Sequence, residues 1–202
     1  MRRRRRDGDG QRRAVHLVGQ SLVTYLRNSY PEPFRTDVPC TFELLSSGEF
    51  ADEANIDPPT LSLYLYRLTF NEHLRNARTT TVAGEPAGAV SLDLHYLLTI
   101  WADNARDEQI VMTWAVHELH RRPVLDLSSL SPAGGWGPGD FVQLIPAELT
   151  TEDLMRIWDA LTPSYRLSLS YIARTVRIDV PQPLGGPVVA TRFRYEDRVG
   201  RR

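Results

Sequence analysis

Lysine is absent from the 202-residue sequence, and cysteine occurs once, at Cys40. A single cysteine excludes an internal disulfide framework and a thiolate-rich zinc site, and it fits a reducing compartment. No apolar run approaches the roughly 18 to 20 residues that a membrane span requires. The arginines at 2–6 are followed by Asp7–Gly10 rather than by the apolar core of a signal peptide. We therefore expect a cytoplasmic protein that has no membrane partner.

The composition is that of an ordinary globular protein. Hydrophobic residues make up 42%, charged residues 24% and aromatic residues 9%, which excludes a wholly disordered chain, a collagen-like chain and a coiled-coil rod. All 24 basic residues are arginine, and the formal net charge is −1. Seven of these arginines lie in residues 1–13, so the rest of the chain is acidic. We interpret residues 1–13 as a disordered Arg-rich arm; binding of nucleic acid by this arm is the alternative.

Hydrophobic periodicity predicts eight elements in the order α-β-β-β-α-β-α-β. Helices are expected at Val15–Arg27, from Asp107 as N-cap to about Arg122, and from Thr150 or Thr151 to Leu161. Strands are expected at Cys40–Leu44, Thr60–Phe70, Ser91–Ala102, Phe141–Ile145 and Tyr165–Ile178. Strands that follow one another favour antiparallel pairing, with helices on one or both faces. The prediction is a single α+β domain at 14–180 with a mostly antiparallel, mixed sheet flanked by helices.

The distribution of apolar residues indicates which faces are buried. Both faces of Thr60–Phe70 are largely apolar, so this strand is expected to be covered on two sides. In the last strand, odd-numbered residues from Tyr165 to Tyr171 are expected to face inward, and Ser168 and Ser170 to face outward. Trp158 lies on the apolar stripe of its helix and is predicted to be a core residue.

We find no arrangement of side chains that predicts catalysis. His117 and His120 lie three apart on one helix face, but no third metal ligand is placed near them, and a solvated polar face is favoured. Asp93 and His95 share one side of a strand, but no nucleophile-bearing turn accompanies them. Cys40 is interpreted as a small core residue. The sequence therefore predicts no enzyme and no catalytic, cofactor-binding or metal-binding residue.

Four segments and one short stretch together resemble a known family. The segments are LSLYLYRLTFNEHLRN at 61–76, LDLHYLLTIWAD at 92–103, PAELTTEDLMRIWDAL at 146–161 and YRLSLSYIARTVRID at 165–179, with HRRPVL at 120–125. By their order and spacing they are similar to the N-terminal domain of the cap, or tail-terminator, protein of phage-tail-like contractile injection systems. Relatives belong to the Photorhabdus virulence cassette and the antifeeding prophage. The resemblance covers residues 15–195.

The resemblance implies a structural protein rather than an enzyme. In that family, subunits form a hexameric ring on the distal end of the inner tube, end tube growth and hold the last layer of sheath. The implied partners are therefore further copies of the chain, the tube protein and the sheath protein, and the protein is cytoplasmic or carried on an assembled particle. Two alternatives stay open: another component of such a machine, as in a baseplate or tube initiator, and a nucleic-acid-binding module. An acidic body without a basic helix argues against the nucleic-acid alternative.

Two segments are candidates for contact with partners. Trp136 lies in the Gly/Pro-rich loop 128–139, which has no hydrophobic period and is expected to be mobile, so Trp136 is a candidate interface residue or else a core residue. Residues 181–202 read as a Pro/Gly linker and an extended arm. The arm pairs with the sheet edge of a neighbouring subunit or of the sheath, or else it folds back on its own domain. The candidate interface residues of the arm are Val189, Arg192, Phe193, Arg194 and Tyr195.

Overall fold

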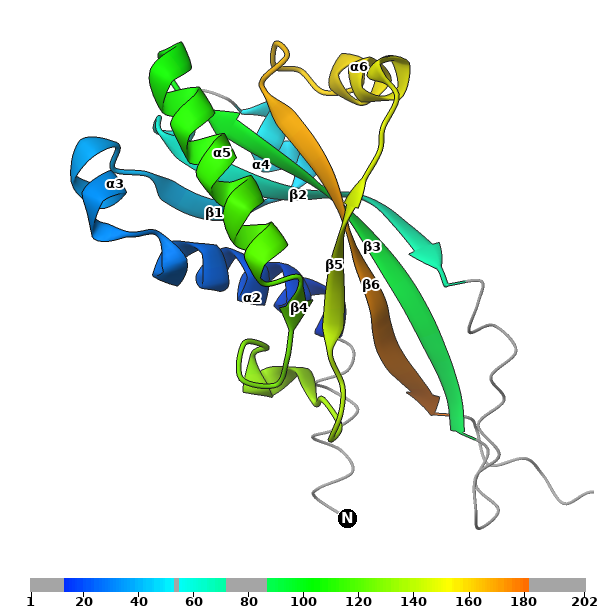
Figure 1. Ribbon diagram of the computed structural model, residues 1–202. Coiled ribbons are helices and arrows are strands. Elements are labelled where there is room, and N and C mark those ends of the chain that lie inside the picture. The colour runs from blue at the N-terminus through cyan, green and yellow to red at the C-terminus, as the bar shows by residue number, and fades with distance from the viewer. Residues whose placement is uncertain (1–12, 53–54, 72–86, 182–202) are drawn as a thin grey trace, which may run out of the picture.

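A six-stranded sheet with helices on both faces is the frame of the molecule (Figure 1). The computed structural model describes residues 13–52, 55–71 and 87–181. In these residues the strands are β1 (Thr41–Leu45), β2 (Thr60–Phe70), β3 (Ala87–Trp101), β4 (Val124–Leu125), β5 (Val142–Ala147) and β6 (Ser168–Pro181). The helices are α2 (Ala14–Ser29), α3 (Glu32–Asp37), α4 (Ser47–Ala51), α5 (Ala105–Arg121), the 3-10 turn η3 (Pro132–Gly134) and α6 (Thr151–Asp159). The predicted α+β class is confirmed.

The strand order is β1-β2-β3-β6-β5-β4, and every pair is antiparallel except β1 with β2. The mixed, mostly antiparallel sheet is therefore confirmed, but the antiparallel pairing expected of consecutive strands is wrong for β1 and β2. Parallel neighbours need a crossover connection of about a dozen residues or more. Residues 46–59 supply this connection and include α4. The last strand in the sequence, β6, lies inside the sheet between β3 and β5.

The helices α2 and α5 cover one face of the sheet and enclose the larger core, which we call the first core. The spacing that predicts α2 is confirmed, because Val18, Leu22 and Leu26 are all buried. The apolar stripe of α5 is also buried and includes Val111, Trp114, Ala115 and Leu119. At Gly19 the helix lies so close to the sheet that a Cβ would be 2.9 Å from Cδ1 of Leu44. The strands contribute Phe42, Leu61, Leu63, Leu94, Tyr96, Leu98 and Ile100 to this core.

The opposite face of the sheet carries a smaller cluster, which we call the second core, beneath α4 and α6. Its buried residues are Leu45, Phe50, Ile56, Leu97, Trp101 and Trp158. The ring centroid of Phe50 lies 5.0 Å from the ring centroid of Trp101 and 5.4 Å from that of Trp158. The prediction that Trp158 is a core residue is therefore confirmed, since 3% of this residue is exposed.

Coverage of β2 on both faces is confirmed only for its first half. Residues 60–63 are buried, whereas Arg67 and Leu68 are exposed and Phe70 is 58% exposed. The far ends of β2, β3 and β6 project beyond the helices, as Figure 1 shows. The alternation of apolar residues in a strand indicates which face each residue is on, but the length of the covering helices decides how far burial extends.

The expected outward orientation of Ser168 and Ser170 to solvent is wrong, because both are buried on the side of the second core. Ser168 Oγ lies 2.9 Å from Thr99 Oγ1, and Ser170 Oγ lies 3.0 Å from the hydroxyl of Tyr66. Two residues that were expected to face inward are exposed: Leu169 by 37%, and Tyr165, which precedes the first residue of β6, by 47%. The parity of the strand was predicted correctly; the helices on the second face, which bury its serines, were not taken into account.

Several element boundaries differ from the prediction for local reasons. The N-cap of α5 is Asn104 rather than Asp107, because Asn104 Oδ1 accepts the Asp107 backbone N–H at 3.0 Å. The helix α4 was not predicted, although Ser46 and Glu49 form a capping box at its start. β3 begins at Ala87, four residues before the predicted start at Ser91. The short helix α3 and strand β4 were also missed.

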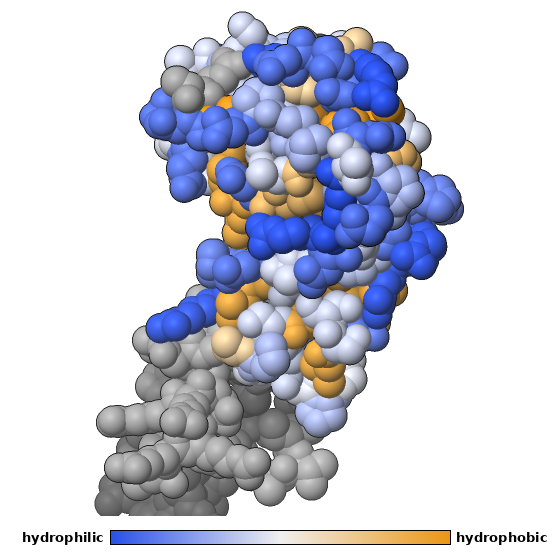
Figure 2. Space-filling model, turned by 90° about the vertical axis from the view of Figure 1, so that its left-hand side faces the viewer, coloured by the Kyte–Doolittle hydropathy of each residue, from blue (hydrophilic) through white to orange (hydrophobic). Residues whose placement is uncertain are grey.

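The sheet ends at β1 on one side and at the two-residue β4 on the other. An edge strand presents backbone N–H and C=O groups that another strand can bind. Figure 2 views the side of the molecule on which β1 and α3 lie and shows apolar patches between hydrophilic side chains. None of the helices in the described ranges combines the length and the apolar character of a membrane-spanning helix.

Candidate interface surfaces

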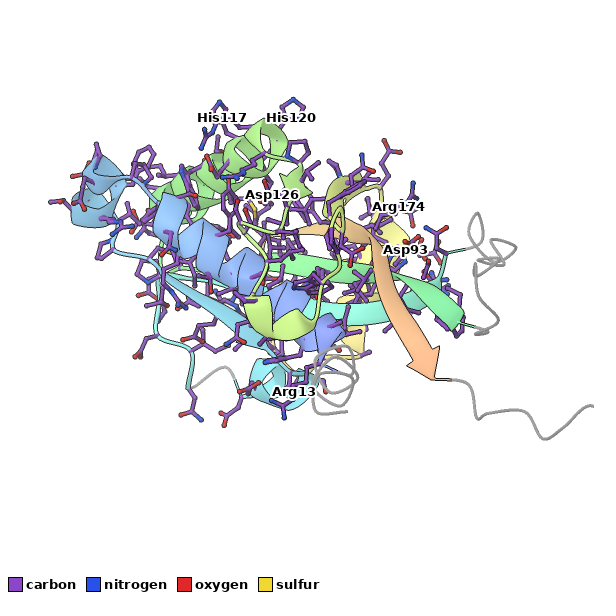
Figure 3. All side chains as sticks on the ribbon, turned by 90° about the horizontal axis from the view of Figure 1, so that it is seen from below. Arg13, Asp93, His117, His120, Asp126 and Arg174 are labelled. Atoms are coloured by element: carbon purple, nitrogen blue, oxygen red, sulfur yellow. The ribbon has the colours of Figure 1, made fainter. Side chains whose placement is uncertain are left out.

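The two candidate metal ligands on α5 point away from the body of the molecule. His117 and His120 are both exposed, and Figure 3 shows their rings on the outer side of the helix. Within the described residues there is no group of three or more His, Cys, Asp or Glu side chains placed to hold a metal ion. Their exposed position matches the solvated polar face that the sequence favours.

Asp93 and His95 belong to a polar cluster that links neighbouring strands. The Asp93 carboxylate accepts hydrogen bonds from Asn71 Nδ2 at 3.0 and 3.2 Å and lies 3.7 Å from Nε of Arg174 on β6 (Figure 3). His95 Nε2 lies 3.0 Å from Thr69 Oγ1 on β2. Burial, and next to it the charge of Arg67, lower the pKa of His95, although Asp93 acts in the opposite direction. These contacts hold the projecting ends of the strands together.

Cys40 lies at the start of β1, half-buried against the first core. Its Sγ donates to the carbonyl oxygen of Thr41 at 3.2 Å. Burial raises the pKa of this thiol to about 12, so it is protonated at neutral pH and a poor nucleophile. Cys40 precedes β1 and lies at the margin of the first core, rather than within a strand of the core as the sequence indicated.

The loop that carries Trp136 is more ordered than its composition suggests. Residues 132–134 form η3, and the indole Nε1 of Trp136 donates to the carbonyl oxygen of Ser131 at 2.8 Å. Gly134 lies directly under the indole, where a Cβ would be 2.3 Å from Cε2 of Trp136. The N–H of Ser131 donates to Ser21 Oγ on α2 at 2.9 Å, so the loop is fixed to a helix.

These contacts contradict the expected lack of a packing partner for Trp136, because its partly buried ring packs against the first core. The signal that sequence reasoning overlooked was Gly134, whose lack of a side chain leaves room for the indole ring of Trp136. Contact of Trp136 with another protein stays a prediction. The other candidate interface residues lie outside the described residues: Val189, Arg192, Phe193, Arg194 and Tyr195.

A groove of about 430 Å³, which we call the edge groove, lies alongside β1 between α2 and α4. It was not foreseen from the sequence. Its lining residues are His16, Gln20, Val23, Thr24, Arg27, Phe42, Glu43, Leu44, Leu45 and Glu49. The signal in the sequence is the row Gln20, Thr24 and Arg27, which at helical spacing places polar side chains beside an apolar stripe. The groove therefore combines polar walls with the open edge of a strand.

A second hollow, of about 720 Å³, lies where α3 meets α5. Phe34, Ile110 and Trp114 give it an apolar floor, and Arg106 and His117 lie at its border. Both hollows are on the surface, and both are open to a partner of protein size. Large exposed apolar residues elsewhere include Leu68, Phe70, Phe141 and Tyr165.

Glu118 is a buried carboxylate that sequence reasoning missed. Glu118 is 5% exposed. Its carboxylate accepts a hydrogen bond from the Tyr25 hydroxyl on α2 and two from Arg121, from Nη2 at 2.7 Å and from Nε at 3.0 Å. Burial alone would raise the pKa of Glu118, but the hydrogen bonds from Arg121 and Tyr25 together hold it below its ordinary value. The helical spacing of Glu118 and Arg121 was visible in the sequence; the approach of Tyr25 from another helix was not.

Comparison with known proteins gives one family and one fold. Residues 17–191 match the Pvc16 N-terminal domain. No protein with a curated description is similar enough to count as a match. A cryo-EM structure of the PVC sheath/tube terminator of an extracellular contractile injection system, in its extended state, is 25% identical with a TM-score of 0.56. The alignment covers 89% of this chain and 62% of that chain.

The cryo-EM structure of the anti-feeding prophage cap, a tube-terminating cap, is 20% identical with a TM-score of 0.57. Here 88% of this chain aligns with 60% of the cap chain, so this chain spans less than two thirds of the length of either relative. The likeness to this cap shows the shared fold. Because the family match extends over most of the sequence and includes both cores, this chain belongs to the Pvc16 N-terminal domain family.

Proposed function

We propose that this protein is a structural cap that terminates the inner tube of a contractile injection system and holds the adjoining sheath. The observation that carries the proposal is the family match together with a fold shared over 89% of the chain with a sheath/tube terminator. A terminator needs surfaces that bind the tube end, the sheath and its own copies. It needs no reactive groups.

The surface of the domain supports this proposal. The edge groove and the hollow between α3 and α5 are lined by separate elements, so the domain offers two distinct surfaces for partners. We propose that six copies close into a ring, because a closed ring leaves none of its contact surfaces unpaired, whereas an open heterologous contact grows into a filament. On this proposal the protein is carried on the assembled particle.

Deletion of the gene tests the capping role. Particles from the deletion strain should have tubes of abnormal length and should lose sheath, and a plasmid copy of the gene should restore both. Electron microscopy of the particles measures tube length and sheath occupancy directly. Particles of normal length that keep their sheath would contradict the proposal, and so would a tagged copy located at the baseplate.

The ring is tested separately on the complemented particles. Class averages of the tube end should show six-fold density attributable to the tagged protein. A different symmetry at a normally terminated tube end would contradict the proposed hexamer but would still agree with the capping role. This second outcome separates the number of subunits from their role.

A further inference from the structure

The outer edge of β1 faces the edge groove with backbone groups that β2 does not use. Thr41 N–H donates to the carbonyl oxygen of Pro59 at 3.0 Å, so Thr41, Glu43 and Leu45 direct their backbone groups to β2. Because successive residues of a strand alternate, the backbone groups of Phe42 and Leu44 point to the outer edge. Arg27 Nη2 donates to the Phe42 carbonyl oxygen at 2.6 Å, which leaves the edge at Leu44 facing the groove. This geometry fits an added strand.

The two sides of the groove differ in character. On the side of α2, Val23 and Leu44 provide apolar surface beside the polar side chains of the same helix, which are His16, Gln20, Thr24 and Arg27. On the side of α4, Glu43 and Glu49 are exposed and place two carboxylates along the same edge. The Glu49 carboxylate accepts the Ser46 backbone N–H at 2.8 Å, which fixes its position. A strand added here would meet acidic residues on one face and, on the other, apolar residues flanked by polar ones.

The chain itself contains a segment with the complementary pattern. Residues 188–195 read VVATRFRY, in which one side carries arginines and the other side carries none. Arg192 and Arg194 share one side, and the opposite side consists of Val189, Thr191, Phe193 and Tyr195. An added strand in the edge groove would therefore place its arginines toward Glu43 and Glu49 and its apolar residues toward Val23 and Leu44.

Chain length decides which copy supplies this strand. The register places Leu45 level with Leu97 of β3, ten residues from Ala87, which pairs with Pro181 at the end of β6. This is about 33 Å along the strands at roughly 3.3 Å per residue, before the sideways distance across the sheet is added. Seven residues from Pro181 to Val188 span at most about 25 Å. Residue 188 therefore does not reach the edge groove of its own domain, so a strand that fills the groove with the whole of 188–195 has to come from another copy.

We propose that residues 188–195 of one copy bind as an added β-strand in the edge groove of a second copy. Each subunit then gives one strand and receives one, which is the arrangement that a closed ring requires. Main-chain hydrogen bonds supply affinity, and the charged side fixes the orientation. This inference rests on the proposed function, because it describes how the copies of a cap are joined.

Disulfide trapping on assembled particles tests the pairing. In a Cys40→Ser background, one protein carries Glu43→Cys and a second carries Arg192→Cys or, separately, Arg194→Cys. Both are produced together with the tube and sheath, and the particles are oxidised and run on a non-reducing gel. A mixed disulfide dimer is expected with one of the two arginine positions. Glu148→Cys, an exposed position outside the edge groove, replaces Glu43→Cys as the matched control and should give no dimer.

The outcomes separate this inference from the proposed function. Particles that carry the protein but give no dimer, or give as much dimer with Glu148→Cys, would overturn the strand exchange and leave the cap in place. A disulfide that closes within a chain carrying both cysteines, and so runs as a monomer, would also overturn it. Particles that carry none of the protein would overturn the proposed function and this inference with it.

A charge swap tests the side-chain complementarity. The double variant Arg192→Glu with Arg194→Glu should reduce the amount of protein retained on particles at least tenfold, because it places four carboxylates together. Adding Glu43→Arg should recover much of this loss, while Glu49 is left intact because it caps α4. Arg198→Glu with Arg201→Glu makes the same change of charge outside 188–195 and should have little effect. An equal loss with this control, or no recovery with Glu43→Arg, would overturn the proposed contact.

Discussion

The two faces of the sheet are buried by helices of different length. The first core combines aliphatic side chains with an aromatic cluster of Tyr30, Phe42 and Trp114, and it lies beneath two long helices, α2 and α5, whose apolar stripes are continuous. The second core is aromatic and lies beneath the short helices α4 and α6, with buried hydroxyl groups on the strands beside it. The long helices bury their face with continuous apolar stripes, whereas α4 and α6 bury the other face with a few large rings, Phe50 and Trp158. Burial on the two faces therefore leaves different marks in the sequence.

Hydroxyl groups are tolerated on the second face because each finds a partner. Ser62 Oγ accepts the indole N–H of Trp101 at 2.8 Å, and Thr99 pairs with Ser168. A buried polar group that is hydrogen-bonded costs little, while an unpaired one costs about 1–3 kcal/mol. The second face thus mixes apolar and hydroxyl side chains. Its hydroxyl residues suggest a solvent-exposed face in the sequence, but they are buried in the structure.

The largest expected effect compares two neighbouring leucines that face opposite cores. Leu98→Ala, in the first core, should lower the free energy of unfolding by about 4–5 kcal/mol, because rigid neighbours beneath long helices leave a cavity open. Leu97→Ala, in the second core, should cost about 2–3 kcal/mol, because the short helices above it can move inward. Denaturant unfolding measures both. An equal or larger loss for Leu97→Ala would remove the distinction between the faces.

A second test concerns the rim of the first core. Trp136→Ala should lower the free energy of unfolding by about 2 kcal/mol, because the ring packs on the core and on Gly134. Trp136→Phe keeps the packing, loses the hydrogen bond to Ser131 and should cost less. Thermal unfolding monitors both variants. Unchanged stability for Trp136→Ala would restore the mobile loop expected from the sequence.

A third test concerns the buried hydroxyls of the second face. Ser62→Ala leaves the indole N–H of Trp101 unpaired and should cost about 1–2 kcal/mol. Combined with Trp101→Phe, the serine substitution should add almost nothing, because the donor is then absent as well. The comparison is a double-mutant cycle in urea. Additive losses would mean that the hydrogen bond does not account for the tolerance of serine here.

The smallest expected effect lies at Glu118, where α2 and α5 meet. Its folded pKa is below the ordinary value, so the stabilisation is present above the unfolded pKa and is lost as pH falls through the folded pKa. Glu118→Gln should cost about 1 kcal/mol at pH 7, discounted because Arg121 is largely exposed. The cost should shrink below about pH 4. Unfolding curves at pH 7 and pH 3.5 test this, and an equal cost at both values would contradict it.

The sequence predicted the positions of α2, α5 and α6 and the five longer strands, because each has a hydrophobic period of its own. It did not predict α3, α4 or β4, which are too short to show one. The burial of Trp158 followed from its helical stripe, whereas the packing of Trp136 depended on Gly134, which lies in the irregular loop 128–139. Among the candidate interface residues, none beyond Trp136 lies in the described part of the chain.

The edge groove shows why part of the candidate site was invisible beforehand. Its walls come from α2, β1 and α4, and no motif in the sequence links Gln20, Glu43 and Glu49. They come together because β1 pairs in parallel with β2 and because α4 crosses to the opposite face from α2. Only the neighbouring polar residues of α2 gave a local signal.

The sequence by itself determined the fold class, the amphipathic faces of the long helices and the alternation within each strand, since these depend on residues a few positions apart. Its motifs, in their order and spacing, also indicated the family. Only the tertiary structure decided that β1 is a parallel edge strand, that serines of β6 are buried, and that Tyr25 meets Glu118. Those outcomes depend on which distant segments pack together, and packing of this kind is selected by the whole chain rather than by any local period.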